Sequence, residues 1–311
     1  MKMSEYQGII PAFYACYDDE GKVDASRTRQ LAGHLLKKGV QGLYVNGSSG
    51  ECIYQSKEER KLILQNVMEE VGDKITIIAH VGCNNTADSQ ELAAHAERLG
   101  VDAIASIPPI YFHLPDRAIA KYWNDISNAA PNTDFFIYNI PQLAGVSLTM
   151  NLFREMLKNP RVRGVKNSSM PVQDIQMFKD AGGEKCVVFN GPDEQLAGGL
   201  VMGAAGGIGG TYGVMPELYL AIKRLVDAGD IKEATRIQNE ANRIITEMGK
   251  CKGNLYAVMK EILHKNEGLS IGGVRPPLAP ISPEDMEQVE QCGVMIQQAV
   301  KSIPSFLGGK E

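Results

Sequence analysis

A lysine follows a short apolar stretch near the middle of the chain. Residues 161–169 read R-V-R-G-V-K-N-S-S, which places Lys166 directly after the apolar segment 162–165. In a dry pocket the ammonium form is disfavoured, the pKa of the amine falls, and the neutral amine can attack a carbonyl. Most lysines are instead solvated at the surface, and this segment alone favours that interpretation. Lys166 is therefore a candidate Schiff-base nucleophile whose role depends on its surroundings.

Two further groups of polar side chains suit a lysine nucleophile. Tyr138 ends an apolar segment, and a phenol tuned by its pocket can carry protons while a carbinolamine becomes an imine. Ser48 and Ser49 lie in a glycine-bracketed turn, whose hydroxyls and backbone N–H groups suit a carboxylate. Lys166, Tyr138 and the two serines would together bind and activate a 2-oxo acid.

A third group suits a polyhydroxylated partner. Ser168 follows Lys166, and Asp193 and Glu194 follow the sequence N-G-P. Each candidate also has a structural explanation. The serine pair could form a plain turn, Tyr138 could be a core tyrosine, and the two acids could favour a helix N-terminus. What distinguishes the two interpretations is whether these residues converge.

The order of elements along the chain answers this question. Apolar strand segments alternate with helical patterns eight times in roughly 225 residues, and strands that are apolar on both faces and followed by helices indicate a parallel sheet. Predicted strands cover residues 8–14, 42–45, 75–80, 102–106, 134–138, 162–165, 186–189 and 206–209. Predicted helices cover residues 24–38, 56–71, 86–99, 116–129, 149–158, 171–180, a short helix from 193, and 216–227.

Eight such units predict an α/β fold of the (β/α)8 TIM-barrel type over residues 1–228, with a C-terminal helical extension over 229–311. An open doubly wound sheet is the alternative, but no G-x-G-x-x-G follows the first strand. A barrel of this kind carries its active site at the carboxyl ends of its strands, where the candidate residues fall.

A glycine-rich run covers the eighth predicted strand, with the sequence G-A-A-G-G-I-G-G at residues 203–210. Barrels often bind phosphate after strands seven and eight, and glycines there would let backbone N–H groups approach an anion. No lysine or arginine lies close by in the sequence. We therefore favour a tightly packed strand over a phosphate site.

Composition limits the possible functions. The chain has 311 residues, of which 44% are hydrophobic and 22% charged, with a formal net charge of −5. This charge argues against general affinity for nucleic acid or anionic membrane. We expect no signal peptide and no membrane span. Six scattered cysteines indicate free thiols in the cytoplasm, and the dispersed cysteines and histidines predict no metal and no other cofactor.

Four motifs resemble the dihydrodipicolinate synthase / N-acetylneuraminate lyase family of class I pyruvate aldolases. They are G-S-S-G-E at 47–51, Y-N-I-P at 138–141, G-V-K-N-S at 164–168 and N-G-P-D-E at 190–194. The resemblance implies Lys166 as the Schiff-base lysine, Tyr138 as the proton-transfer tyrosine, and Ser48 and Ser49 as the pyruvate-carboxylate loop. It also implies a homotetramer in which Tyr111 reaches into a neighbouring subunit's site.

Within this family the chain is similar to the sialic acid lyase branch. H-V-G-C at 80–83 and Y-N-I-P-Q-L-A-G-V at 138–146 resemble that branch, and Ser168, Gly191, Asp193 and Glu194 match its sugar-binding positions. Dihydrodipicolinate synthases carry an arginine for a second carboxylate where this chain has Leu143. Lysine biosynthesis is therefore disfavoured on charge grounds.

Two positions depart from the lyase pattern. Gly210 replaces a serine whose hydroxyl helps to hold the sugar's glycerol tail, a loss of about 1 kcal/mol for one hydrogen bond. Ser168 replaces a threonine that is common in bacterial lyases. The hypothesis is cleavage of N-acetylneuraminate to N-acetylmannosamine and pyruvate. Alternatives are a family aldolase or dehydratase acting on a 2-keto-3-deoxy sugar acid, dihydrodipicolinate synthase, or a non-catalytic sensor of 2-oxo acids.

Overall fold

The computed structural model describes residues 6–304 and confirms the predicted barrel. Eight parallel strands follow one another around a central sheet in the order β1-β8-β7-β6-β5-β4-β3-β2. Between β1 and β2 the barrel is joined by an isolated parallel bridge from Ala12 to Tyr44. The strands are β1 (Gly8–Pro11), β2 (Gly42–Val45), β3 (Thr76–His80), β4 (Ala103–Ser106), β5 (Asp134–Asn139), β6 (Val162–Asn167), β7 (Val187–Asn190) and β8 (Gly206–Gly209).

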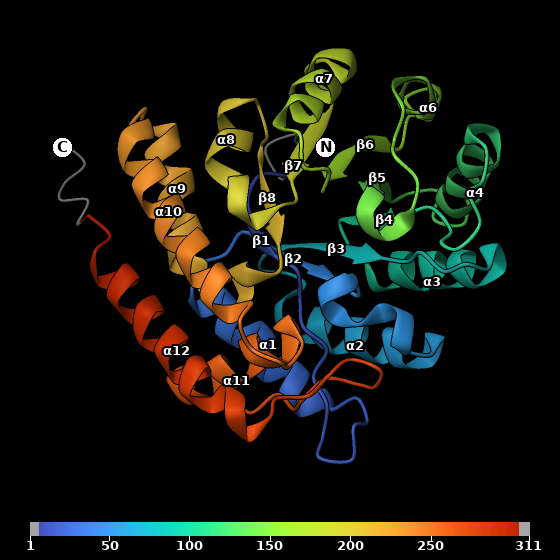
Figure 1. Cartoon of the computed structure of the whole chain (residues 1–311). Coiled ribbons are helices and arrows are strands. Elements are labelled where there is room, and N and C mark those ends of the chain that lie inside the picture. Colours follow the sequence, from blue (N-terminus) through green and yellow to red (C-terminus); the bar gives the residue numbers. More distant parts are fainter. Residues whose placement is uncertain (1–5, 305–311) are drawn as a thin grey trace.

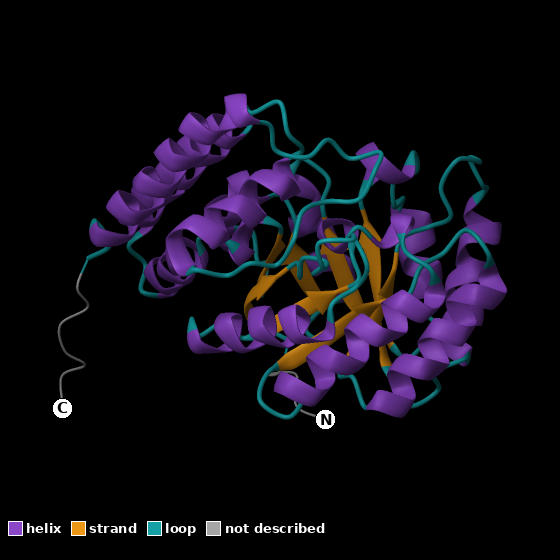
Figure 2. Ribbon diagram, turned by 90° about the horizontal axis from the view of Figure 1, so that it is seen from below, coloured by secondary structure: helices purple, strands orange, loops and turns teal. Residues whose placement is uncertain are grey.

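A ring of helices surrounds the strands (Figures 1 and 2). The barrel helices are α1 (Ala25–Lys37), α2 (Lys57–Val71), α3 (Thr86–Leu99), α4 (Asp116–Asn128), α5 (Pro141–Ala144), α6 (Met150–Met156), α7 (Val172–Gly182), α8 (Leu196–Val201) and α9 (Pro216–Asp227). Helix α2 begins after a capping box that Ser56 and Glu59 form. Helix α3 ends at Gly100, whose backbone is left-handed.

The strands are apolar on both faces because they separate two cores. One core fills the barrel interior and includes Ile78, Phe136 and Phe189. The other lies between the strands and the helices and includes Ile77, Phe135 and Val188. Neighbouring residues of one strand thus enter different cores, as the pleat requires. The backbone of glycine-rich β8 pairs directly with β1, and Gly206 lies opposite Gly8, which fits the packed strand favoured from the sequence.

The C-terminal part is helical, as predicted. Its helices are α10 (Ile231–Met248), α11 (Leu255–Glu267) and α12 (Met286–Lys301), and they lie together on one flank of the barrel (Figure 1). Ser282 caps a 3₁₀ turn, η6 (Pro283–Asp285), that leads into α12. The ends of the two predicted regions, residues 1–5 and 305–311, lie outside the described residues. The division at residue 228 stays a prediction.

Several boundaries differ from the predictions. The first strand ends at Pro11 rather than at residue 14, because the chain then leaves the sheet and Tyr17 N–H donates to the carbonyl of Ile271. Strand β6 continues through Lys166 to Asn167, so the lysine is the last residue but one of the strand rather than the first after it. Helix α5 and the short 3₁₀ turns after β2, which are η2 (Ser48–Gly50) and η3 (Cys52–Tyr54), were not predicted.

Candidate active site

One pocket at the carboxyl ends of the strands gathers almost all the predicted site residues. Its volume is about 270 Å³. The predicted residues that line it are Ser48, Ser49, Tyr138, Lys166, Ser168, Gly191, Asp193 and Glu194. They come from the ends of β2, β5, β6 and β7, which a parallel barrel brings to one rim. These eight residues therefore lie together at one rim, while Tyr111, which was predicted to act in a neighbouring subunit's site, does not line this pocket.

Lys166 is buried at the bottom of this pocket. Its side-chain nitrogen lies 4.0 Å from the ring centroids of both Tyr44 and Tyr138. Burial lowers the pKa of Lys166 to about 7, and the negative charge of Asp193 partly opposes the shift. At neutral pH a large fraction of the amine is therefore unprotonated, which is the form that attacks a carbonyl.

Tyr138 stands next to this amine with its hydroxyl protonated. Burial raises the pKa of Tyr138 far above its ordinary value, and side-chain hydrogen bonds with Ser48 and Ser168 partly oppose the shift. The hydroxyl is therefore held between the predicted carboxylate turn and the predicted sugar-binding serine. In this position it can give a proton to a group bound at Lys166 and receive one back.

The turn after β2 presents Ser48 and Ser49 to the pocket. The N–H groups of Gly50 and Glu51 close the turn by donating to the carbonyls of Gly47 and Ser48. The N–H groups of Ser48 and Ser49 lie at the start of this turn, where helical geometry leaves such donors without a partner inside the turn. Hydroxyl and N–H donors on one side of the pocket suit a carboxylate.

Two acidic residues, Asp193 and Glu194, also line the pocket. A carboxylate oxygen of Asp193 accepts hydrogen bonds from the backbone N–H of Thr211 at 2.7 Å and from its hydroxyl at 2.6 Å. Burial raises the pKa of Asp193 to about 6, although the Thr211 hydrogen bonds lower it. Gln238 and Asn242 of α10 donate to the backbone carbonyls of Asp193 and Glu194 at 3.0 Å each, so the C-terminal part also supports this turn.

Two glycines shape the space between these groups. A Cβ atom on Gly191 would lie 2.0 Å from the hydroxyl oxygen of Ser168, so the loops after β6 and β7 can meet because residue 191 has no side chain. A Cβ atom on Gly210 would lie 3.0 Å from the hydroxyl of Ser49 and 4.0 Å from Asp193. The departure at Gly210 therefore leaves room directly beside the carboxylate turn.

Helix α11 supplies pocket residues that sequence reasoning missed. Leu255, Tyr256 and Met259 line the pocket, and the side chain of Tyr256 forms a hydrogen bond with Ser49. These residues follow the end of the predicted barrel and carry no motif. The helical pattern of the extension predicts helices, but it does not predict which of them covers the mouth of the barrel.

Tyr111 does not reach the pocket of its own chain. Its side chain is 86% exposed, its backbone is left-handed with φ 86°, and its ring makes an edge-to-face contact with the 71% exposed Phe112. Both aromatic residues line a separate hollow beside α4. The predicted role of Tyr111 in a neighbouring subunit's site stays a prediction.

Residues 6–304 contain neither a helix suited to cross a membrane nor a cluster of side chains suited to hold a metal ion. Their helices lack the combination of length and apolar character that a bilayer crossing needs. Their His, Cys, Asp and Glu side chains do not gather in threes around a possible metal position. The six cysteines are free thiols.

Comparisons with known proteins agree with the geometry. The model of the dihydrodipicolinate synthetase family matches residues 5–297. An N-acetylneuraminate lyase from Mediterraneibacter gnavus is 63% identical over 96% of this chain and 95% of its own length. An N-acetylneuraminate lyase from Escherichia coli is 33% identical over 94% of this chain and 97% of its own length. A Ruminococcus gnavus sialic acid aldolase with a mutated catalytic lysine superposes with a TM-score of 0.96 at 62% identity, over 97% of this chain and 99% of that one.

Proposed function

Because the chain belongs to the dihydrodipicolinate synthetase family, we propose that it is a class I aldolase that cleaves N-acetylneuraminate to N-acetylmannosamine and pyruvate. The observation that carries the proposal is Lys166, a buried amine whose pKa is lowered to about 7 at the bottom of the pocket. The 63% identity to an N-acetylneuraminate lyase supports the choice of substrate.

The chemistry begins at Lys166. Its neutral amine attacks the C2 ketone of the open-chain substrate to form a carbinolamine. Tyr138 donates its proton to the carbinolamine hydroxyl, which leaves as water, and the phenolate that remains lies beside the protonated imine. Ser48 and Ser168 stabilise this phenolate through their hydrogen bonds with Tyr138.

Carbon–carbon cleavage then needs one base and one electron sink. The Tyr138 phenolate takes the proton of the C4 hydroxyl, the C3–C4 bond breaks, and its electron pair moves into the protonated imine. N-acetylmannosamine leaves as the aldehyde, and the enamine of pyruvate stays on Lys166. Tyr138 returns its proton to C3 of the enamine, which leaves a protonated imine and the Tyr138 phenolate. Water hydrolyses this imine to pyruvate and the free amine, and the proton released goes back to the phenolate.

Two sets of pocket residues bind different parts of the substrate. Ser48 and Ser49 bind the carboxylate next to the ketone, because their turn offers hydroxyl and N–H donors. Ser168, Gly191, Asp193 and Glu194 surround the hydroxylated part of the sugar, where carboxylate and hydroxyl groups serve as hydrogen-bond partners. The steps above use neither a metal nor an organic cofactor.

The alternatives fit the pocket less well. Leu143 lines the pocket at the position where dihydrodipicolinate synthases need a cation, so a second carboxylate would meet an apolar side chain. A protein that only binds 2-oxo acids does not require an amine with a pKa near 7 beside a protonated phenol, whereas an aldolase does. A shorter 2-keto-3-deoxy sugar acid remains the second candidate, since Gly210 lacks the hydroxyl that holds the end of a longer sugar.

We also propose a cytoplasmic homotetramer. Free thiols at all six cysteines fit a reducing compartment. The exposed pair Tyr111 and Phe112 forms an apolar projection that a partner subunit would bury. Light scattering on the pure protein tests the assembly. A tetramer that Tyr111→Ala weakens supports the proposal, and a monomer with full activity contradicts it.

The decisive experiment measures pyruvate release from N-acetylneuraminate by the pure protein, with Lys166→Ala as the control. Borohydride is added in parallel, since it traps an imine as a stable adduct that intact mass reveals. We expect release and trapping by the wild type and neither by the variant. Trapping of pyruvate without any release from N-acetylneuraminate would keep the aldolase chemistry and overturn the substrate.

A further inference from the structure

The carboxylate turn ends at a buried acidic residue that the mechanism does not use. Glu51 directly follows Ser48–Gly50, its side chain is completely buried, and its backbone is left-handed with φ 54°. A residue other than glycine rarely adopts this backbone conformation, and it does so where the surrounding structure holds it in place. An isolated buried carboxylate is also costly, so the partners of Glu51 must be strong ones.

The shortest of these contacts come from the C-terminal extension, while the hydroxyl of Tyr17 in the barrel region donates to Glu51 at 3.4 Å. The ammonium group of Lys260 in α11 lies 2.8 Å from one carboxylate oxygen of Glu51, and Lys260 is itself 2% exposed. Lys260 also donates to the carbonyl of Gly273 at 2.6 Å. The backbone N–H of Arg275 donates to the other carboxylate oxygen of Glu51 at 2.9 Å. One buried carboxylate thus joins the turn to a helix and to a loop that lie over 200 residues later.

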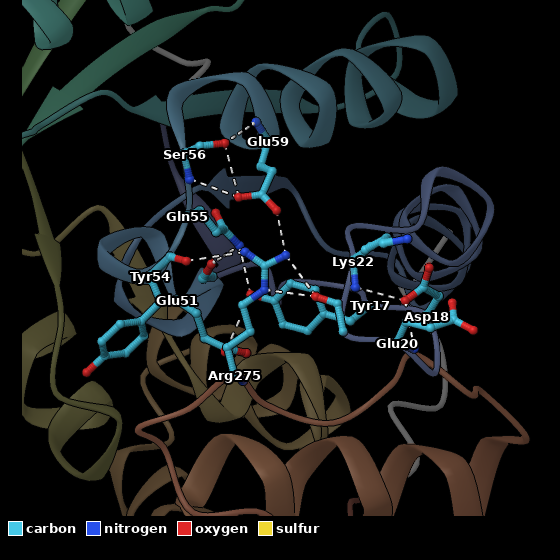
Figure 3. A network of polar contacts seen from close by, with 12 residues as sticks. Tyr17, Asp18, Glu20, Lys22, Glu51, Tyr54, Gln55, Ser56, Glu59 and Arg275 are labelled. Atoms are coloured by element: carbon cyan, nitrogen blue, oxygen red, sulfur yellow. Dashed lines mark hydrogen bonds and ion pairs between the residues drawn. The ribbon is translucent and has the colours of Figure 1, made fainter.

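The side chain of Arg275 extends this connection beyond the turn (Figure 3). Its guanidinium donates to Glu59 at 2.5 Å and to the carbonyl of Tyr54 at 3.2 Å, and its carbon lies 4.5 Å from the ring centroid of Tyr17. The segment from Glu51 to Glu59 is therefore held at both ends by the same loop of the extension.

The helix that carries Lys260 also reaches the substrate side of the turn. Tyr256 lies four residues before Lys260, and this spacing places both side chains on one face of α11. Tyr256 forms its hydrogen bond with Ser49, while Lys260 pairs with Glu51. Helix α11 thus contacts this region at two points, with Tyr256 at Ser49 and with Lys260 at Glu51.

We propose that Lys260 is a positioning residue, whose buried ion pair with Glu51 holds the Ser48–Gly50 turn in the geometry that binds the carboxylate of the 2-oxo acid. The inference rests on the proposed function where it assigns the carboxylate to this turn. It predicts that losing the pair weakens binding of pyruvate more than binding of the aldehyde, because the aldehyde is assigned to Ser168, Gly191, Asp193 and Glu194, which the ion pair does not contact.

The test uses the Lys260→Met variant and two companions. Glu51→Gln combined with Lys260→Met removes both charges, which avoids leaving a buried carboxylate without a partner and keeps the test usable if the single variant folds poorly. Lys38→Met is the matched control. Lys38 lies between Glu217 at 2.6 Å and Glu267 of α11 at 2.9 Å, so it ties the same helix to the barrel without contacting the turn.

Two quantities are measured on the folded proteins. The first is the pyruvate concentration that gives half-maximal borohydride trapping on Lys166, and the second is the KM for N-acetylmannosamine in the condensation direction. In both Lys260 variants we expect the pyruvate concentration for half-maximal trapping to rise on the order of tenfold, because a displaced turn loses its interactions with the carboxylate. The KM for N-acetylmannosamine should change less than about twofold. In Lys38→Met both should stay near their wild-type values.

The outcomes separate this inference from the proposed function. If the pyruvate concentration for half-maximal trapping in the Lys260 variants equals that of the wild type, the ion pair is merely structural. Equal rises in this concentration and in the KM for N-acetylmannosamine would lead to the same conclusion. An absence of any pyruvate adduct on the wild-type protein would instead contradict the proposed function.

Discussion

Tyr138 and Lys166 lie directly opposite one another on adjacent strands, β5 and β6, in the parallel register. This pairing places the lysine nitrogen 4.0 Å from the centroid of the tyrosine ring. The distance is set by the spacing of neighbouring strands rather than by a flexible loop. The reacting amine and its proton donor are therefore held by the most rigid part of the fold.

The lowered pKa of Lys166 predicts how imine formation depends on pH. Its amine is protonated below about pH 7 and free above it. We expect the rate of borohydride trapping with pyruvate to rise about tenfold per pH unit below 7 and to level off above it. A trapping rate that continues to rise up to pH 10 would mean that Lys166 keeps the pKa of an ordinary lysine.

The same shift predicts that Lys166 destabilises the protein. Between pH 7 and the ordinary lysine pKa of 10.5, the unfolded state binds a proton that the folded state does not, so the free energy of unfolding rises with pH over this window. Lys166→Met should raise the free energy of unfolding by about 2–4 kcal/mol at pH 7. The gain should shrink as the pH approaches 10.5. Urea unfolding of both proteins at several pH values measures it, and an unchanged or lower stability would contradict the burial argument.

Tyr138→Phe should separate imine formation from bond cleavage. The ring stays beside Lys166, so the amine keeps its surroundings, but the proton donor is lost. We expect kcat for cleavage to fall by about 10²–10⁴, the usual contribution of one acid–base group, while pyruvate remains trappable more slowly. A variant with near wild-type kcat would exclude the hydroxyl from the mechanism.

Asp193→Asn tests the sugar side of the pocket. The amide oxygen can still accept from Thr211, so the turn keeps its hydrogen bonds. Loss of the charge should lower kcat/KM for N-acetylneuraminate about tenfold. Trapping of pyruvate should stay unchanged above pH 7, where the amine of Lys166 is already unprotonated. In the wild type, the part of kcat/KM that needs the ionised carboxylate should appear as the pH rises through about 6. Equal losses for both ligands would place Asp193 outside the sugar site.

Gly210→Ser tests the departure from the lyase pattern. Gly210 has φ −71°, so a side chain meets no backbone penalty there. Its Cβ atom would lie 3.0 Å from the hydroxyl of Ser49, and the new hydroxyl would compete for that group. We expect the pyruvate concentration for half-maximal trapping to rise about threefold to tenfold, with Gly210→Ala as the control for volume. Tighter binding of pyruvate in Gly210→Ser would refute this account.

Most of the barrel could be predicted because its signals are local. The strand predicted at 162–165 is recognised by its apolar residues, although β6 continues to Asn167, and helix α2 is recognised by the capping box of Ser56 and Glu59. The convergence of Lys166 and Tyr138 then follows from topology, since eight parallel strands must end on one rim. The lowered pKa of Lys166 followed from its burial there.

The contributions of the extension could not be predicted in this way. Tyr256 and Met259 line the pocket, and Lys260 reaches Glu51, because helix α11 packs over the barrel mouth. That position depends on how three helices pack together, and no pattern within α11 encodes it. In the G-S-S-G-E motif the serines looked functional, whereas the glutamate gave no sign that its partner lies 209 residues away.

The distance along the chain between Glu51 and Lys260 has a consequence for protein synthesis. A nascent chain that has left the ribosome as far as α9 already contains all eight strands, the nucleophile and its tyrosine. It still lacks Lys260 and Arg275, so Tyr17 is present but the ammonium group that pairs with the carboxylate of Glu51 is not. The eight strands can be complete before the catalyst is, because helix α11 and the loop at Arg275, which finish the substrate site, are translated after them.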